Sequence, residues 1–83
     1  GVPKDMAYPD PGLRATWHGR AVTITATALA RAVMLDFGAV GAQPSDDGFD
    51  LLPGESRTVS VASAASPAVL ARALTLRSLG SRR

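Results

Sequence analysis

Four acidic residues gather within residues 45–61, which read SDDGFDLLPGESRTVSV. They are Asp46, Asp47, Asp50 and Glu55, and together we call them the acidic corner. Two carboxylates can hydrolyse a glycoside when one has a raised pKa and the other stays ionised across a groove. One exposed loop offers no apolar pocket to separate two pKa values, and the spacing does not match a calcium-binding EF-hand loop. The pattern instead favours a turn, because aspartate side chains accept hydrogen bonds from nearby backbone N–H groups.

The only histidine, His18, follows the only tryptophan, Trp17. A catalytic histidine needs a nucleophile and an orienting acid, and the chain has no G-x-S-x-G motif, so we interpret His18 as a surface residue. Rows of exposed aromatic rings can bind sugars, yet Trp17 and Phe37 fall in phase with apolar positions, which favours core packing. No glycine-rich loop opens a helix to cradle a phosphate. We therefore predict no catalytic residue, no metal site and no cofactor within this chain.

The composition indicates which partners and compartments this chain can be expected to have. The 83 residues suit one domain, and a net charge of +2 with scattered arginines indicates no nucleic-acid partner. Without cysteine and without a run of about 18 apolar residues, we predict neither disulfides nor a membrane partner. No secretory signal is visible, but the sequence begins at Gly1, which suggests a fragment or a trimmed chain. The hydrophobic content of 46% is high for so small a domain and suggests apolar surface facing a neighbour.

Alternation of apolar and polar residues predicts strands along most of the chain. Residues 1–12 are rich in proline and are interpreted as an extended lead-in. Residues 39–48 break the alternation and predict a loop. Gly19 and the Pro53-Gly54 pair mark tight turns. The predicted strands, in order, are 13–18, 21–28, 30–38, 49–52, 56–62 and 73–79.

Residues 66–72 carry the signals of a helix start. Ser66 suits the capping position, Pro67 suits the first helical position, and Val69, Leu70 and Ala73 share one face. We predict one or two helical turns over 67–72 ahead of the closing strand. A continuous helix over 67–79 remains the alternative.

Short strands at spacings of about 8–12 residues, with no room for long crossovers, predict an antiparallel, immunoglobulin-like β-sandwich. The sandwich is expected over residues 13–80, with a tail over 81–83. The positions in phase with the buried faces of the strands form the predicted core: Trp17, Val22, Ile24, Val33, Leu35, Phe37, Val59, Val61, Leu74 and Leu76.

The acidic corner and the end of the chain also carry a family resemblance. The stretch resembles the C-terminal immunoglobulin-like domain of β-mannosidases of glycoside hydrolase family 2, which typically reads Ser-Asp-Asn, an aromatic residue, Leu-Leu-Pro-Gly and a strand. The matching motif residues are Ser45, Asp46, Gly48, Phe49, Leu51, Leu52, Pro53 and Gly54. Asp47 departs from the pattern, because asparagine is usual there. The closing segment SPAVLARALTLRSLG is similar to the closing turn and strand of the family, so the resemblance covers about residues 13–80.

The resemblance implies a supporting role. Parent enzymes of this family remove terminal β-linked mannose with retention, using glutamates on a separate barrel domain, so no catalytic role carries over to Glu55. The implied partners are the other domains of the parent enzyme and, at the parent active site, an oligosaccharide. For the parent, the cytoplasm is favoured over secretion, and the richness in alanine and arginine is typical of bacteria with high genomic GC content.

Other classes of protein stay open at this point. A carbohydrate-binding module would need an exposed aromatic row. A fibronectin-type spacer of an unrelated extracellular protein would share the sandwich. A free-standing hydrolase would need a catalytic pocket, and the sequence shows no set of residues typical of one.

Overall fold

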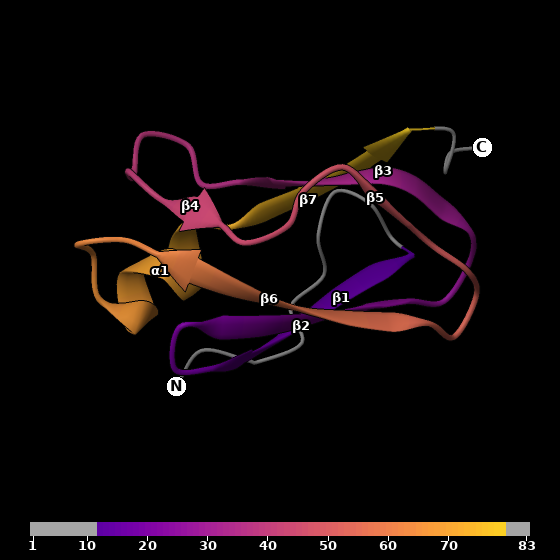
Figure 1. The fold of residues 1–83 in the computed structure, drawn as a ribbon, viewed down its shortest axis with the longest axis horizontal. Coiled ribbons are helices and arrows are strands. Elements are labelled where there is room, and N and C mark those ends of the chain that lie inside the picture. Colours follow the sequence, from indigo (N-terminus) through magenta and orange to yellow (C-terminus); the bar gives the residue numbers. More distant parts are fainter. Residues whose placement is uncertain (1–11, 80–83) are drawn as a thin grey trace.

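The computed structural model describes residues 12–79 as two antiparallel β-sheets that pack face to face, with one short helix (Figure 1). The strands are β1 Leu13–His18, β2 Ala21–Ala26, β3 Ala30–Asp36, β4 Gln43–Pro44, β5 Phe49–Leu51, β6 Ser56–Ala62 and β7 Thr75–Leu79, and the helix is α1 Pro67–Ala73. One sheet has the order β1-β2-β6-β4, and the other has the order β5-β3-β7. This arrangement confirms the predicted all-β sandwich with a helical turn before its last strand. The predicted tail and residues 1–11 of the predicted lead-in lie outside the described residues.

Alternation along the strands places apolar side chains between the two sheets. In β2, Val22 and Ile24 are fully buried, whereas Thr23 and Thr25 point to the opposite face of the sheet. Thr23 Oγ1 lies 2.9 Å from Thr58 Oγ1 on β6, so hydroxyl pairs link the two strands on their outer face. The buried hydrophobic core consists of Leu13, Ala15, Val22, Ile24, Ala26, Ala30, Val33, Leu35, Phe37, Phe49, Leu51, Val59, Val61, Leu70, Leu74 and Leu76.

Trp17 departs from the predicted core because it is only partly buried. It lies on β1, the edge strand of its sheet, where fewer neighbours cover a large ring. The indole packs edge-on against Phe37, with ring centroids 6.4 Å apart. Trp17 therefore lies at the rim of the core rather than at its centre.

The helix begins and ends as its sequence signals indicate. The Ser66 Oγ accepts a hydrogen bond from the Val69 N–H at 3.3 Å, and Pro67 occupies the first turn. Leu74 is extended, with φ of −68° and ψ of 128°, so the chain leaves the helix there and enters β7. The alternative of a continuous helix over 67–79 is wrong, and the closing strand starts at Thr75, two residues later than predicted.

Other strands also differ from those predicted. The predicted loop over 39–48 contains a two-residue strand, β4, in which Gln43 pairs with Ala62 and Pro44 pairs with Val61. Proline is tolerated there because β4 is an edge strand, whose free side needs no backbone donor. The second strand ends at Ala26 rather than at residue 28, β3 ends at Asp36 rather than at residue 38, and β5 ends at Leu51 rather than at residue 52.

A bulge interrupts β3. Its register shifts between Ala30 and Val33 against β5 and between Arg31 and Met34 against β7, and Ala32 has φ of +53°. Ala30 and Val33 are both buried although three positions separate them, because the extra residue changes the phase of the alternation. The bulge leaves backbone donors that the neighbouring loop has to satisfy.

Candidate functional site: the acidic corner

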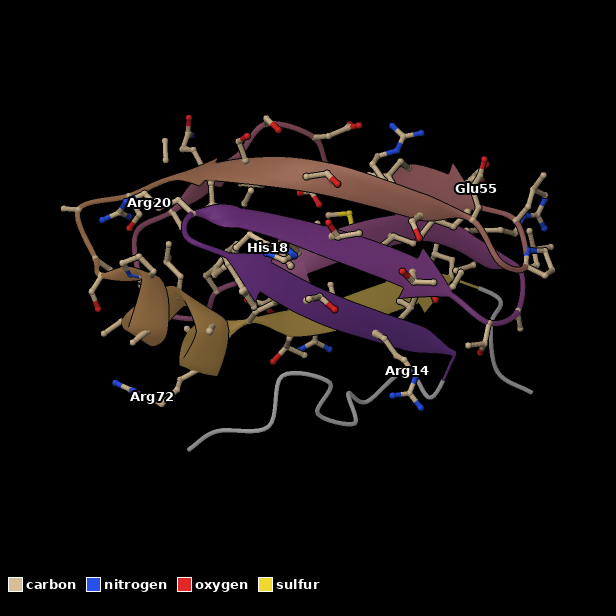
Figure 2. The ribbon with its side chains drawn as sticks, turned by 90° about the horizontal axis from the view of Figure 1, so that it is seen from below. Arg14, His18, Arg20, Glu55 and Arg72 are labelled. Carbon is tan, nitrogen blue, oxygen red and sulfur yellow. The ribbon has the colours of Figure 1, made fainter. Side chains whose placement is uncertain are left out.

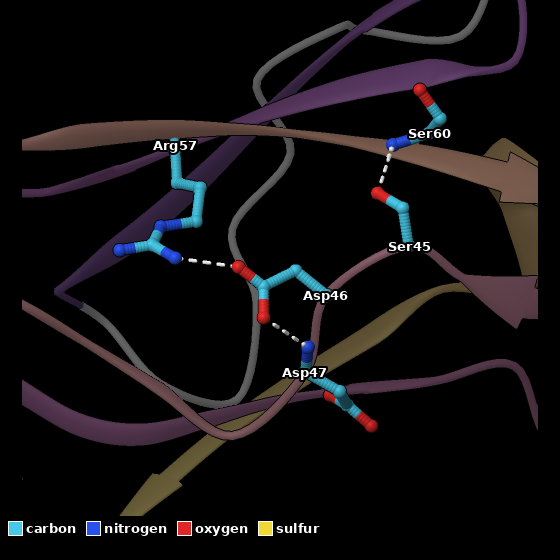
Figure 3. Close-up of polar contacts among 5 residues, drawn as sticks. All are labelled: Ser45, Asp46, Asp47, Arg57 and Ser60. Carbon is cyan, nitrogen blue, oxygen red and sulfur yellow. Dashed lines mark hydrogen bonds and ion pairs between the residues drawn. The ribbon is translucent and has the colours of Figure 1, made fainter.

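The acidic corner lies along the chain between β4 and β6, a stretch that includes β5 (Figure 1), and it bonds β3 on the side where β5 pairs. Its geometry starts from Ser45, whose N–H donates to the Ser60 carbonyl at 2.7 Å. The Ser45 Oγ accepts a hydrogen bond from the Ser60 N–H at 3.0 Å, as Figure 3 shows. This reciprocal pair fixes the start of the corner against β6.

Asp46 closes the turn that follows. One carboxylate oxygen accepts a hydrogen bond from the Asp47 N–H at 2.9 Å, and the other pairs with Nη1 of Arg57 (Figure 3). The Arg57 guanidinium also lies 4.7 Å from the centre of the Phe49 ring. Asp46 is therefore held between its own backbone and an arginine that covers a core aromatic residue.

Asp47 and Asp50 accept hydrogen bonds from the bulged strand, β3. The Asp47 Oδ1 accepts a hydrogen bond from the Leu35 N–H at 2.9 Å, and the Asp50 Oδ1 accepts one from the Ala32 N–H at 2.9 Å. β5 has three residues against seven in β3, so its backbone does not cover the whole edge. The two carboxylates satisfy donors that the ladder leaves open.

Gly48 continues this contact, because its N–H donates to the Val33 carbonyl at 2.7 Å. Its φ of +70° is a conformation that glycine adopts without strain, which explains a glycine between the two aspartates. Phe49 follows and points inward with an exposure of 7%. The motif residues thus attach the loop to β3 and then deliver an aromatic side chain to the core.

The second turn of the motif uses the remaining acid. The Glu55 carboxylate accepts a hydrogen bond from the Leu52 N–H at 2.8 Å, and Gly54, with φ of +83°, lies between them. The Gly54 N–H donates to the Ala26 carbonyl at 2.7 Å, which attaches the turn to the end of β2. Leu51 is fully buried, whereas Leu52 is exposed, so only the first leucine of the Leu-Leu-Pro-Gly motif contributes to the core.

Every carboxylate within residues 12–79 therefore makes a hydrogen bond to a backbone N–H group. Asp36, outside the corner, follows the same rule: its Oδ1 accepts from the Gly38 N–H at 2.8 Å, and its Oδ2 accepts from Arg77 Nε at 3.3 Å. The Gly38 hydrogen bond has the largest effect and holds the pKa of Asp36 below its ordinary value; partial burial opposes it, and the hydrogen bond and charge of Arg77 reinforce it. These acids act as backbone acceptors and ion-pair partners, and their geometry does not present two free carboxylates across a groove.

Other candidate residues do not converge on the corner. His18 is exposed beside the β1–β2 hairpin, whereas Glu55 adjoins the far end of β2, and Figure 2 shows the two well apart. Arg20, in the same hairpin, donates from Nη1 to the carbonyls of Ser63 and Ala65, so it holds the segment leading into α1. No pattern in the sequence predicts that Arg20 binds these distant carbonyl groups.

Among residues 12–79, no group of three or more histidine, cysteine, aspartate or glutamate side chains is arranged to hold a metal ion. Within the same part of the chain, no helix has the length and apolar character needed to cross a membrane.

Comparison with known protein families agrees with the geometry. The family model Ig_mannosidase, described as an Ig-fold domain, matches residues 8–82. The chain belongs to this family. The match confirms the resemblance to the immunoglobulin-like domain of a mannosidase that the motif residues predicted, and it covers nearly the whole sequence. A comparison with curated proteins gave no significant match.

Membership of the mannosidase-associated Ig-fold family gives the acidic corner a plain interpretation. In this Ig-fold domain, the corner is the connection that crosses from β4 in one sheet to β5 in the other, and then returns to β6. Its acids contact both sheets, because Asp47 accepts the Leu35 N–H of β3 and Asp46 pairs with the Arg57 side chain of β6. The corner therefore has a structural role: it connects the two sheets of the sandwich and is bonded to both.

Proposed function

We propose that this Ig-fold domain is the non-catalytic C-terminal domain of a family 2 glycoside hydrolase resembling β-mannosidase. Its role is structural support and packing against the other domains of that enzyme, which are its partners. The parent enzyme hydrolyses terminal β-mannosidic bonds with retention, at an active site on another domain where the oligosaccharide binds. A bacterial parent fits the alanine and arginine content of the chain.

The observation that carries this proposal is the engagement of the acids. A retaining glycosidase needs a nucleophilic carboxylate and an acid/base carboxyl about 5–5.5 Å apart on either side of the bond to be cleaved. Each acid of the corner instead accepts a hydrogen bond from a backbone N–H group, at distances of 2.8–2.9 Å. Chemistry on mannosides therefore belongs to another part of a larger enzyme.

A carbohydrate-binding role receives less support from the aromatic side chains. Among the described residues, Phe37 and Phe49 are buried and Trp17 is partly buried against Phe37. A sugar-binding platform needs the faces of rings to be open to solvent. Tyr8, the remaining aromatic residue, lies outside the described residues.

An activity comparison tests the proposal. The 83-residue chain and the full reading frame that encodes it are assayed with 4-nitrophenyl β-mannoside. We expect no hydrolysis by the chain alone, and hydrolysis with retained anomeric configuration by the full product. Turnover by the chain alone, or a full product without glycosidase activity, would contradict the proposal.

A further inference from the structure

The acidic corner contains one peptide bond with a covalent reactivity of its own. Asp47 is the only aspartate of the chain that a glycine follows, and the chain has no asparagine. The backbone nitrogen after an aspartate can attack the side-chain carboxyl group and close a succinimide ring. A following glycine makes this attack easiest, because no Cβ stands beside its nitrogen. In an unfolded chain of this sequence, the bond between Asp47 and Gly48 is therefore the one expected to react first.

In the folded domain, both reacting groups are bonded to β3. The Gly48 N–H donates to the Val33 carbonyl at 2.7 Å, and the Asp47 Oδ1 accepts the Leu35 N–H at 2.9 Å. Val33 and Leu35 present these groups on the same side, because alternate residues of an antiparallel strand bond the same neighbour. Ring closure requires the Asp47 side chain and the following peptide group to rotate toward each other. Both hydrogen bonds to β3 therefore have to open before the ring can form.

The residues on either side of this bond are anchored as well. Ser45 exchanges two hydrogen bonds with the backbone of Ser60, one through its N–H and one through its Oγ. Phe49, directly after Gly48, is buried in the core with an exposure of 7%. The reactive bond thus lies between two fixed points, and its release requires part of the corner to leave β3. A local opening of this kind has its own free energy, separate from that of global unfolding.

We infer that the bond between Asp47 and Gly48 is a site of spontaneous isoaspartate formation, which the contact with β3 keeps unreacted in the folded domain. In the reaction, the Gly48 nitrogen bonds to Cγ of Asp47. The proton of that nitrogen and one proton from solvent leave with a carboxylate oxygen as water. Water then opens the ring at either carbonyl carbon, and opening at the main-chain carbonyl leaves the chain running through Cγ. No electron is transferred, and the final mass is unchanged.

Isomerisation would weaken the attachment of the corner to β3. Isoaspartate lengthens the backbone by one carbon at position 47, so the hydrogen bonds to Val33 and Leu35 no longer match the spacing of the strand. The Leu35 N–H then loses its acceptor, and an unsatisfied donor beside the core is unfavourable. A chain that has reacted during one opening event therefore keeps a weakened corner after it closes again. The site does not depend on the proposed function of the domain.

Peptide mapping tests this site. The 83-residue chain is incubated at neutral pH, folded in buffer and unfolded in guanidinium chloride, and isoaspartate is located by electron-transfer fragmentation of its peptides. We expect isoaspartate at position 47 to form at least about tenfold faster in the unfolded chain, because the reaction no longer waits for local opening. Equal rates in the two states would overturn the protection by β3. Faster isomerisation at another aspartate of the unfolded chain would overturn the choice of site.

Two serine variants separate local opening from unfolding. Ser45→Ala removes the oxygen that accepts the Ser60 N–H, so isoaspartate at position 47 should form about three- to tenfold faster in the folded variant. Ser60→Ala is the matched control, because the backbone groups of Ser60 make both bonds and its side chain is not needed for them. Its rate should stay within about twofold of the unaltered chain. Circular dichroism checks that both variants are folded, and equal rates in the two variants would contradict the anchoring of the corner.

Two further measurements check the chemistry and its consequence. Asp47→Glu should form no isomer at position 47 in guanidinium chloride, because the longer side chain would have to close a larger and less favourable ring. Isomer formation in that variant would contradict the succinimide route. The isomerised chain, purified and refolded, should unfold at a lower denaturant concentration than the unreacted chain. An unchanged unfolding midpoint would refute the weakening of the corner.

Discussion

Replacing Asp47 with alanine should destabilise the domain, whereas replacing it with asparagine should not. The Asp47 Oδ1 accepts the Leu35 N–H at 2.9 Å, in a partly buried position beside the core strand β3. Alanine leaves that backbone donor without its acceptor, and an unsatisfied donor of this kind costs about 1–3 kcal/mol. Asparagine keeps a carbonyl oxygen at the same place, so its effect should stay within about 0.5 kcal/mol.

The assay is urea unfolding of the unaltered chain and the two variants, followed by tryptophan fluorescence. Exchange of the Leu35 amide, measured by NMR, supplies a local readout that should quicken in the alanine variant. Asp46→Asn is the matched control in the neighbouring position, where an exposed ion pair with Arg57 contributes about 0–1 kcal/mol. Equal losses for alanine and asparagine at position 47 would show that charge, rather than a backbone acceptor, is what the corner requires. No loss in either variant would refute the structural role of Asp47.

Three further substitutions probe the bulge, the core and the titration of one acid. Ala32→Gly should raise the free energy of unfolding by about 1 kcal/mol, because its φ of +53° strains a residue with a Cβ, whereas the control Ala62→Gly in β6 should lower it. Phe49→Ala should cost about 3–5 kcal/mol in urea unfolding, and a loss within the range of surface changes, about 0.5 kcal/mol, would show that the ring is not packed. Asp36 has its pKa held below the ordinary 3.8, first by the Gly38 N–H, so its carboxylate stabilises the fold above that value and the contribution is lost as the pH falls through the lowered pKa. Asp36→Asn should therefore flatten the acid side of the curve of thermal stability against pH, and an unchanged acid side would contradict this assignment.

The sequence allowed the strands and the fold class to be predicted where one simple periodicity governs the chain. Val22, Ile24, Val59 and Val61 are buried because strict alternation leaves no other arrangement of their side chains. The helix could be predicted from the capping serine and the proline that follows it. Local signals of this kind need no knowledge of distant partners.

The parts that could not be predicted depend on contacts between distant segments. The bulge at Ala32 is stable because Asp50, 18 residues away, accepts its N–H. The two-residue strand β4 exists because β6 offers it an edge, although Pro44 and its neighbours read as a loop. The acidic corner was expected to be a turn. Its hydrogen bonds from the Leu35 and Ala32 N–H groups also attach it to β3, and no local pattern in the sequence predicts that contact.

A titration of the 83-residue chain with mannose and β-mannobiose, followed through backbone amide shifts by NMR, tests the central claim most directly. The claim is that the acidic corner is a structural connection between the two sheets and that the described domain has no sugar site of its own. We predict no localised shifts at millimolar sugar. Localised, saturable shifts in residues 45–50 or at Trp17 would contradict the claim and would make carbohydrate binding a function of the domain itself.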